Sequence, residues 1–321
     1  GSMTEVSIDG NWEYTYPGRL LKLADVNETV KTLYQVSDHS FNSNQTQDYH
    51  LSILLSGDGF SYVAGNKEPR RLIELGSFEF VIPLDVNRAL RNEKALCLFS
   101  NFVIEHAWLG NPFGHSGIWI ENRYSTLIPE ALYDEHALHE YLSFNLQIPQ
   151  DYILRSEYIP SIEAWNVFAL PAEWQKQIAF ILPSVKFHHA SSCFIEAIIA
   201  HGNIGELNEN VFIYPHRFYF EMAYTVKNKL IFYNTFPYST QEDFIYFVLF
   251  GFEQLGLNPE IVPVILMGEI DTGSLLHLIL IRYVRNVNFA SRNKDVIYTY
   301  AFDQIPSHYF LNIIYSLQCE L

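Results

Sequence analysis

The chain contains 321 residues, enough for two domains of about 150 residues each. Hydrophobic residues make up 49% of it, so a large core can be buried and wholesale disorder is excluded. Its 20 basic and 36 acidic side chains give a formal net charge of -16, which excludes a broad basic surface for nucleic acid or for an anionic membrane.

The cysteine content and the hydropathy of the chain predict a protein of the reducing cytoplasm. No C-x-x-C pair occurs among the three widely spaced cysteines, so neither a disulfide framework nor a zinc knuckle is expected; they are Cys97, Cys193 and Cys319. Gly1 and Ser2 precede Met3 in the form of an expression-tag remnant. The most apolar run, residues 244–252, is much shorter than the ~18 residues of a membrane span. We therefore expect a cytoplasmic protein with no membrane insertion and no nucleic-acid partner.

The first half of the chain predicts a three-stranded meander and a helix after a weakly structured start. Residues 1–47 are distinguished only by a cluster of turn formers at 38–46. The apolar pattern then predicts three antiparallel strands, at 50–55, 60–64 and 71–81. A tight turn at 56–59 joins the first two strands. A helix follows Pro83, with Asp85 as its N-cap.

The middle of the chain predicts a hairpin and then alternating strands and helices. The hairpin joins residues 116–121 to residues 124–128, and a helix at 134–144 follows it. The later elements are a strand at 166–170, a helix opened by Pro171, a strand at 184–188 and a helix at 191–200. Strands that alternate with crossover helices predict parallel pairing within a sheet that is buried on both faces.

The second half of the chain repeats the order of the first. Three strands are predicted, at 211–214, 217–224 and 230–235. The helix after Pro237 has Ser239 and Glu242 as a candidate capping box and ends near Leu255. The remaining elements are a strand at 261–267, a helix that Asp271 or Thr272 caps and that runs to Tyr283, and a helix at 307–317.

One spacing links the two halves of the chain. The offsets from strand to proline to helix cap are the same in Phe78, Pro83 and Asp85 as in Phe232, Pro237 and Ser239. We interpret this match as an internal repeat, with chance as the alternative because strand–proline–helix junctions are common. The expected fold is α/β, with a mixed sheet in each of two domains, residues 48–205 and 206–321, after the segment 1–47.

The predicted order in each half, three strands followed by a helix, a strand and a helix, resembles the ribonuclease H-like superfamily of sugar kinases, actin and heat-shock chaperones. Residues 232–238, 242–246 and 252–255 are similar to an uncharacterised bacterial domain-of-unknown-function family associated with an actin-like ATPase fold. Shorter matches to the same family are residues 49–53, 58–61, 126–129, 267–270 and 283–286. The resemblance implies duplicated actin-like domains, each with a three-stranded antiparallel meander and crossover helices, and it implies no particular reaction.

The resemblance also implies where a nucleotide would bind. Members of the superfamily hold ATP between the domains, on two hairpin turns that each carry an Asp-x-Gly sequence. The first turn here reads Ser56, Gly57, Asp58, Gly59. Serine stands where the family pattern has aspartate, and Asp58 comes two residues later.

The other two nucleotide motifs implied by the resemblance are also altered. In the second turn Pro215 has no N–H to offer a phosphate, and His216 and Arg217 are bulky. The adenosine motif keeps Gly268 but has Glu269 in place of its second glycine. We therefore expect a degenerate nucleotide site without catalytic or metal-binding residues, with ATP and Mg²⁺ as the alternative cofactor.

Three further patterns have a functional and a structural interpretation. His136 and His139 could share a metal ion on one helix, but the apolar positions of that helix place both on the solvent side. His188 and His189 end a strand, and we expect one packed and one exposed imidazole. The aromatic helix at 244–252 is expected to be buried almost all round, with a partner surface as the alternative.

The leading hypothesis is a non-catalytic binding or scaffold module with an actin-like fold and an unidentified protein partner. Neither a Gly-x-Ser-x-Gly nucleophile motif nor a Walker loop is present in the sequence. One alternative is an ATP-binding phosphotransferase or ATPase in which Asp58 organises the metal. The other is a partner-dependent assembly factor, because similar folds serve in pilus machinery.

Overall fold

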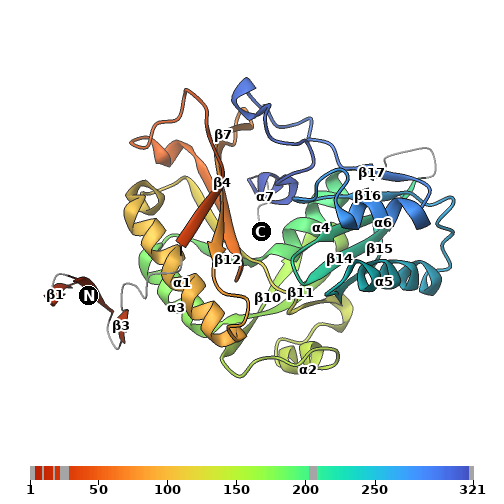
Figure 1. Cartoon of the computed structure of the whole chain (residues 1–321), viewed down its shortest axis with the longest axis horizontal. Helices are drawn as coiled ribbons and strands as arrows, with labels where there is room; N and C mark the ends of the chain where they lie inside the picture. The colour runs from red at the N-terminus through yellow and green to blue at the C-terminus, as the bar shows by residue number, and fades with distance from the viewer. Residues whose placement is uncertain (1–3, 9–10, 17–18, 22–28, 202–207, 318–321) are drawn as a thin grey trace.

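The computed structural model describes residues 4–8, 11–16, 19–21, 29–201 and 208–317. Gly1 and Ser2, which the sequence analysis interpreted as a tag remnant, and Cys319 lie outside the described residues. The first three strands form a small separate sheet: β1 (Thr4–Ile8), β2 (Asn11–Tyr16) and β3 (Arg19–Leu21). Most of the remaining described chain builds two large sheets that flank a central pair of helices (Figure 1), and an inserted segment forms a further three-stranded sheet.

The first large sheet has six strands in the order β12-β8-β5-β6-β7-β4. Its strands are β4 (Thr29–Ser37), β5 (His50–Leu55), β6 (Gly59–Asn66), β7 (Arg71–Val81), β8 (His115–Ile120) and β12 (Lys186–His189). β5, β6 and β7 form the predicted antiparallel meander, and β8 and β12 continue the sheet in parallel. One face packs against the helices α1 (Arg88–Glu105) and α3 (Ala172–Ile181).

The second large sheet repeats this plan with five strands in the order β15-β14-β13-β16-β17. Its strands are β13 (Glu209–Pro215), β14 (Tyr219–Val226), β15 (Lys229–Pro237), β16 (Val264–Leu266) and β17 (Val287–Phe289). The first three are antiparallel and the last two are parallel to β13. The helices α5 (Gln241–Gln254) and α6 (Leu275–Tyr283) cover one face, and α4 (Ala190–His201) and α7 (Leu311–Ser316) cover the other. The α/β class and the mixed sheets predicted from the sequence are confirmed.

The predicted hairpin of residues 116–121 and 124–128 is wrong. β8 pairs only in parallel, while the next strand belongs to an inserted three-stranded sheet of order β10-β11-β9 with a short helix beside it. The insertion comprises β9 (Ser125–Pro129), α2 (Leu138–Ser143), β10 (Tyr152–Ile159) and β11 (Ala164–Pro171). Asn122 redirects the chain, because its side chain accepts a hydrogen bond from the Tyr124 amide and donates one to the Ala169 carbonyl.

Three helix N-caps lie later in the chain than the sequence predicted. The structure places them at Asn87, Thr240 and Ser274 in place of Asp85, Ser239 and the pair Asp271 or Thr272. Each actual cap has extended backbone and accepts a hydrogen bond from an amide of the first turn. Neighbouring polar residues are equally good candidates in the sequence, so only the point where the chain bends decides between them.

Two predicted helices are shorter in the structure, and strands appear where none was expected. The helix predicted at 134–144 forms only as α2, because the Asp134 carboxylate first closes a turn onto the His136 amide. The helix predicted at 307–317 forms as α7, after Phe310 in the left-handed region with φ 58°. β4, in the segment expected to be weakly structured, pairs with β7 along the edge of the first sheet.

The C-terminal part of the chain crosses from the second sheet to the first. Phe302, Phe310 and Ile313 pack against Val63 and Leu75 of the first sheet. α7 also contacts α4, so these two helices lie between the sheets (Figure 1). The second sheet is therefore held to the first by the C-terminal segment, and the division into domains 48–205 and 206–321 stays a prediction.

Candidate functional site

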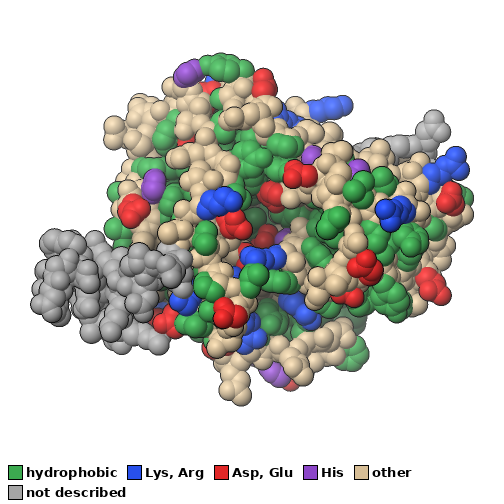
Figure 2. Space-filling model, in the orientation of Figure 1, with side chains coloured by type: hydrophobic (Ala, Val, Ile, Leu, Met, Phe, Trp, Pro, Cys, Tyr) green, Lys and Arg blue, Asp and Glu red, His purple; other side chains and the backbone are tan. Residues whose placement is uncertain are grey.

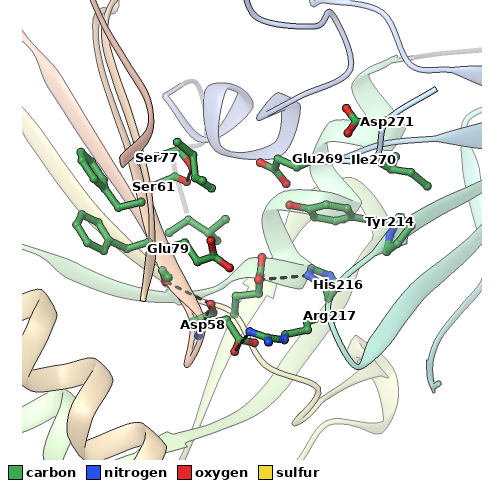
Figure 3. A pocket seen from close by; sticks show the side chains of 18 of the residues that line it. Asp58, Ser61, Ser77, Glu79, Tyr214, His216, Arg217, Glu269, Ile270 and Asp271 are labelled. Carbon is green, nitrogen blue, oxygen red and sulfur yellow. Dashed lines mark hydrogen bonds and ion pairs between the residues drawn. The ribbon is translucent and has the colours of Figure 1, made fainter. Parts of the chain in front are cut away.

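A cleft of about 670 Å³ lies between the two sheets, where the first turns of the two meanders face each other. Six of the eight candidate residues from the sequence line it: Ser56, Asp58, Gly59, His216, Arg217 and Glu269. Gly57 and Gly268 are not among the lining residues. Figure 3 shows the labelled side chains of this pocket, which come from both large sheets and from the loop after β16.

Two backbone amides of the turn between β5 and β6 donate hydrogen bonds to acceptors within the same turn. The Ser56 amide donates to the Gly59 carbonyl over 2.9 Å, and the Asp58 amide donates to the Ser56 hydroxyl over 3.1 Å. A Cβ on Gly59 would lie 2.3 Å from the carbonyl oxygen of Phe78, so the close approach of β7 requires glycine here. The amides of Ser56 and Asp58 therefore serve the turn and are not directed at a ligand.

The turn between β13 and β14 is closed in the same way. The His216 amide donates to the Tyr219 carbonyl over 2.8 Å, and Pro215 has no amide hydrogen. The Tyr238 hydroxyl donates to the His216 carbonyl. This turn therefore presents side chains to the cleft, and the amide of His216 is already bonded.

Asp58 forms an ion pair across the cleft. Its Oδ1 atom lies 3.2 Å from Arg217 Nη1 in the second turn and 3.1 Å from Arg91 Nη1 on α1. Burial raises the pKa of Asp58, while Arg217 and Arg91 act to lower it. A single carboxylate oxygen thus accepts from two guanidinium groups, and one of them belongs to the opposite sheet.

Glu121, a residue that the sequence analysis missed, forms the second ion pair across the cleft. It follows β8 directly, and its Oε1 lies 3.2 Å from His216 Nδ1. His216 Nε2 donates to Glu221 over 2.8 Å, and the Tyr233 hydroxyl donates to the same Glu221 carboxylate over 2.7 Å. The position of Glu121 at the carboxyl end of a parallel strand is the signal that could have found it.

The His216 side chain is a buried cation. Burial alone lowers the pKa of its imidazole, but Glu121 and Glu221 outweigh burial and raise the pKa to about 10. The side chain is almost fully covered, and its two ring nitrogens face one carboxylate from each sheet. The imidazolium therefore joins the two halves electrostatically.

Further carboxylates line the walls of the cleft. Glu269 keeps solvent-exposed surface, but desolvation by the surrounding cleft walls, together with the negative charge of Glu121, raises its pKa to about 7. Asp271 accepts a hydrogen bond from the Tyr309 hydroxyl, and Glu79 lines the wall formed by β7. Figure 3 shows Asp58, Glu79, Glu269 and Asp271 around the pocket. The lining is therefore rich in negative charge.

Gly268 is required by packing. It has φ +91°, and a Cβ built there would lie 2.1 Å from the ring of the buried Tyr214. The tyrosine ring thus occupies the space beside this glycine. Gly268, the glycine kept from the adenosine motif, therefore makes room for the side chain of Tyr214.

The other candidate histidines lie away from the cleft lining. His136 and His139 are exposed, as expected. His188 and His189 are both buried, so the prediction of one exposed imidazole is wrong. The inserted sheet covers them: Glu157 of β10 lies 2.7 Å from His188 Nδ1 and accepts from the His189 amide. Among the described residues no group of three or more His, Cys, Asp or Glu is arranged to hold a metal ion.

Comparison with solved structures identifies the class of the fold. A Bacteroides thetaiotaomicron protein described as having an actin-like ATPase fold and unknown function superposes with a TM-score of 0.72 at 19% sequence identity, covering 87% of this chain and 99% of that one. A chain of the PilM-PilN type IV pilus biogenesis complex superposes with a TM-score of 0.55 at 12% identity, covering 85% and 97%. The chain therefore has the actin-like ATPase fold that the resemblance implied.

A comparison of the sequence with family profiles identifies the family of the chain. The profile described as "Protein of unknown function (DUF3822)" matches residues 38–287, and the chain belongs to this family. The expected membership of an uncharacterised family with an actin-like fold is confirmed. No curated protein matches the sequence. Among the helices in the described ranges, none has the length and apolar character needed to cross a membrane.

Proposed function

We propose that the protein is a non-catalytic binding or scaffold module whose interdomain cleft is not a nucleoside triphosphate site. The observation that carries this proposal is the pair of ionic contacts across the cleft, Asp58 to Arg217 and Glu121 to His216. The first contact joins the two turns that would have to stand apart to receive phosphates, and the second joins the end of β8 to the second turn. The amides of Ser56, Asp58 and His216 are bonded within the turns, which also supports the proposal.

The charge of the cleft supports the same conclusion. Of the five carboxylates that line it, Asp58, Glu79 and Glu121 pair with Arg217, Lys31 and His216, and the remaining two are Glu269 and Asp271. Two like unit charges about 10 Å apart repel by roughly 1.7 kcal/mol at an effective dielectric constant of 20. A triphosphate carries several negative charges, so this lining disfavours it unless bound cations neutralise part of the repulsion.

A phosphotransferase that uses Asp58 to organise Mg²⁺ is the enzymatic alternative. For this role a hydrated metal ion would have to bind the other carboxylate oxygen, Oδ2, beside the positive charges of Arg91 and Arg217, which repel it. Both guanidinium groups lie within 3.2 Å of the same oxygen, and Arg91 Nη2 is also anchored to the Pro83 carbonyl. This arrangement favours a structural role for Asp58.

The proposal is tested by titration calorimetry with Mg-ATP together with a phosphate-release assay. We expect no binding heat at ligand concentrations up to about 1 mM, which corresponds to a binding free energy weaker than roughly -4 kcal/mol, and no turnover. Micromolar binding with turnover would overturn the non-catalytic role. In that case Asp58→Ala should abolish turnover with little change in melting temperature, and activity that survives would remove Asp58 from the mechanism.

A partner-dependent assembly factor is the second candidate function. The observation that favours it is the structural likeness to a chain of the PilM-PilN type IV pilus biogenesis complex. We also propose a bacterial, cytoplasmic setting: the three widely spaced cysteines favour a reducing compartment, and the resemblance to a bacterial family favours the source. Fractionation of the source cells would test the location.

A further inference from the structure

The outer surface of α5 and α6 exposes apolar side chains that the fold does not use. The two helices lie side by side on one face of the second sheet (Figure 1). The exposed fractions are 63% for Tyr246, 38% for Phe250, 42% for Leu278 and 47% for Ile281. These four residues define what we name the helical face.

The helical face is separate from the core contacts of α5. Phe244, Val248 and Phe252 fill the core side of this helix and are almost completely buried. Tyr246 and Phe250 stack on each other instead, with ring centroids 6.4 Å apart. The prediction that this aromatic helix is buried almost all round is therefore wrong. Exposed apolar groups that gather on one surface mark interaction sites.

The charge of the helical face differs between its two helices: the charged side chains of α5 are all acidic, while α6 carries one exposed basic side chain, Arg282. The sequence contains no Lys or Arg between Lys229 and Arg282. The same stretch contains six carboxylates, of which Glu242, Asp243 and Glu253 belong to α5, Glu260 pairs with Arg285 over 3.7 Å, and Glu269 and Asp271 line the cleft. Glu242 and Glu253 are exposed on α5 itself. Figure 2 shows hydrophobic side chains beside acidic ones over this part of the molecule, with basic side chains among them.

We propose that the helical face binds an amphipathic helix of a protein partner, with Lys and Arg flanking the apolar stripe of that helix. Apolar anchors would pack on Tyr246, Phe250, Leu278 and Ile281, and basic side chains would pair with Glu242 and Glu253. The inference rests on the proposed binding function and adds the surface and the chemistry of the partner.

Charge complementarity decides between the occupants of the helical face. A second copy of this chain has a net charge of -16 and would bring further carboxylates to an acidic rim. A membrane surface with anionic lipids would be repelled for the same reason. A basic helix meets both the apolar residues and the carboxylates with favourable contacts.

The test uses a fluorescent synthetic helix of leucine and lysine with one apolar face. We expect saturable binding to the full chain by fluorescence anisotropy. The double variant Tyr246→Ser, Phe250→Ser should weaken this binding at least tenfold, and Glu242→Gln with Glu253→Gln should reduce both the affinity and its dependence on salt. Circular dichroism and the melting temperature establish that each variant is folded.

Matched controls make each outcome decisive. Leu132→Ser with Phe144→Ser removes two exposed apolar side chains near the inserted sheet and should leave binding unchanged. The proposal is overturned if this control weakens binding equally, if a leucine and glutamate helix binds as well, or if the wild-type chain does not bind the basic helix. Self-association lost in the Phe250→Ser variant, or binding to phosphatidylglycerol vesicles lost in it, would also overturn it.

The failure of this proposal is distinguishable from the failure of the proposed function. Mg-ATP calorimetry reports on the cleft, while the helix titration reports on α5 and α6. A chain that hydrolyses ATP yet binds the basic helix would refute only the non-catalytic role. A chain that binds neither would refute only the helical face as a partner site.

Discussion

The first turns of the two meanders occupy equivalent places in the repeated unit but carry opposite charge. The first turn presents Asp58, and the strand beside it ends at Glu121, whereas the second turn presents His216 and Arg217. Each anion from the first half pairs with a cation from the second. The two halves therefore share one backbone plan. The different side chains at and beside their first turns form the ion pairs that connect the two sheets.

The largest effect should follow from removing the buried cation. His216→Ala leaves the carboxylates of Glu121 and Glu221 facing each other without a counter-charge. We expect the free energy of unfolding to fall by about 3–5 kcal/mol, as for other broken buried ion pairs. Urea denaturation measures the loss, and the exposed His136→Ala serves as a matched control with no expected change. A loss below about 1 kcal/mol would show that the imidazolium does not join the halves.

The same residue predicts how stability changes with pH. The pKa of His216 is about 10 in the folded chain and about 6.5 in an unfolded one, so the folded state binds the proton more tightly. Its stabilisation is fully present below about pH 6.5 and is lost as the pH rises through about 10. Urea denaturation across this range should show a decline in the wild type that is much smaller in His216→Ala. Parallel profiles would contradict the assignment.

The glycines of the first turn should differ sharply in their tolerance of a side chain. A Cβ on Gly59 would collide with the Phe78 carbonyl, whereas a Cβ on Gly57 meets Asn92 at an ordinary 3.6 Å. We expect Gly59→Ala to lower the free energy of unfolding by about 2–3 kcal/mol and Gly57→Ala to change it by less than about 1 kcal/mol. Equal effects would mean that the approach of β7 does not require glycine at position 59.

The smallest effect on the free energy of unfolding should come from the ion pair between Asp58 and Arg217. The side chains of Asp58 and Arg217 are 31% and 36% exposed, so solvent screens their attraction. A double-mutant cycle with Asp58→Asn and Arg217→Gln should give a coupling energy of about 0.5–1 kcal/mol that shrinks in about 1 M salt. A coupling energy of zero at low salt would remove this pair from the contacts that join the turns.

Local patterns predicted most of the strands because each is a short apolar run bounded by turn formers. The meanders 50–81 and 211–235 are of this kind, and their pairing follows from the tight turns between neighbours. The strands β1, β2, β3, β4, β10 and β17 were not predicted. β4 is mostly exposed along the sheet edge, and β17 is only three residues long, so neither has a strong apolar signature.

The sequence predicted where the candidate site lies but not which of its residues contact one another. The resemblance located both turns, and six of the eight candidate residues line one cleft. The ion pairs depend on how the two sheets face each other, which no spacing in the sequence specifies. Glu121 and Glu221 lie about a hundred residues apart and meet only through His216. Long-range placement of charge therefore had to come from the structure.

The central claim is that the two turns are held together by charge pairs in the space a triphosphate would need. A crystal structure grown in a large excess of Mg-ATP tests it most directly. We predict that the contacts of Asp58 with Arg217 and of Glu121 with His216 persist and that no phosphate lies between the turns. Density for ATP between separated turns, with either ion pair broken, would contradict the account.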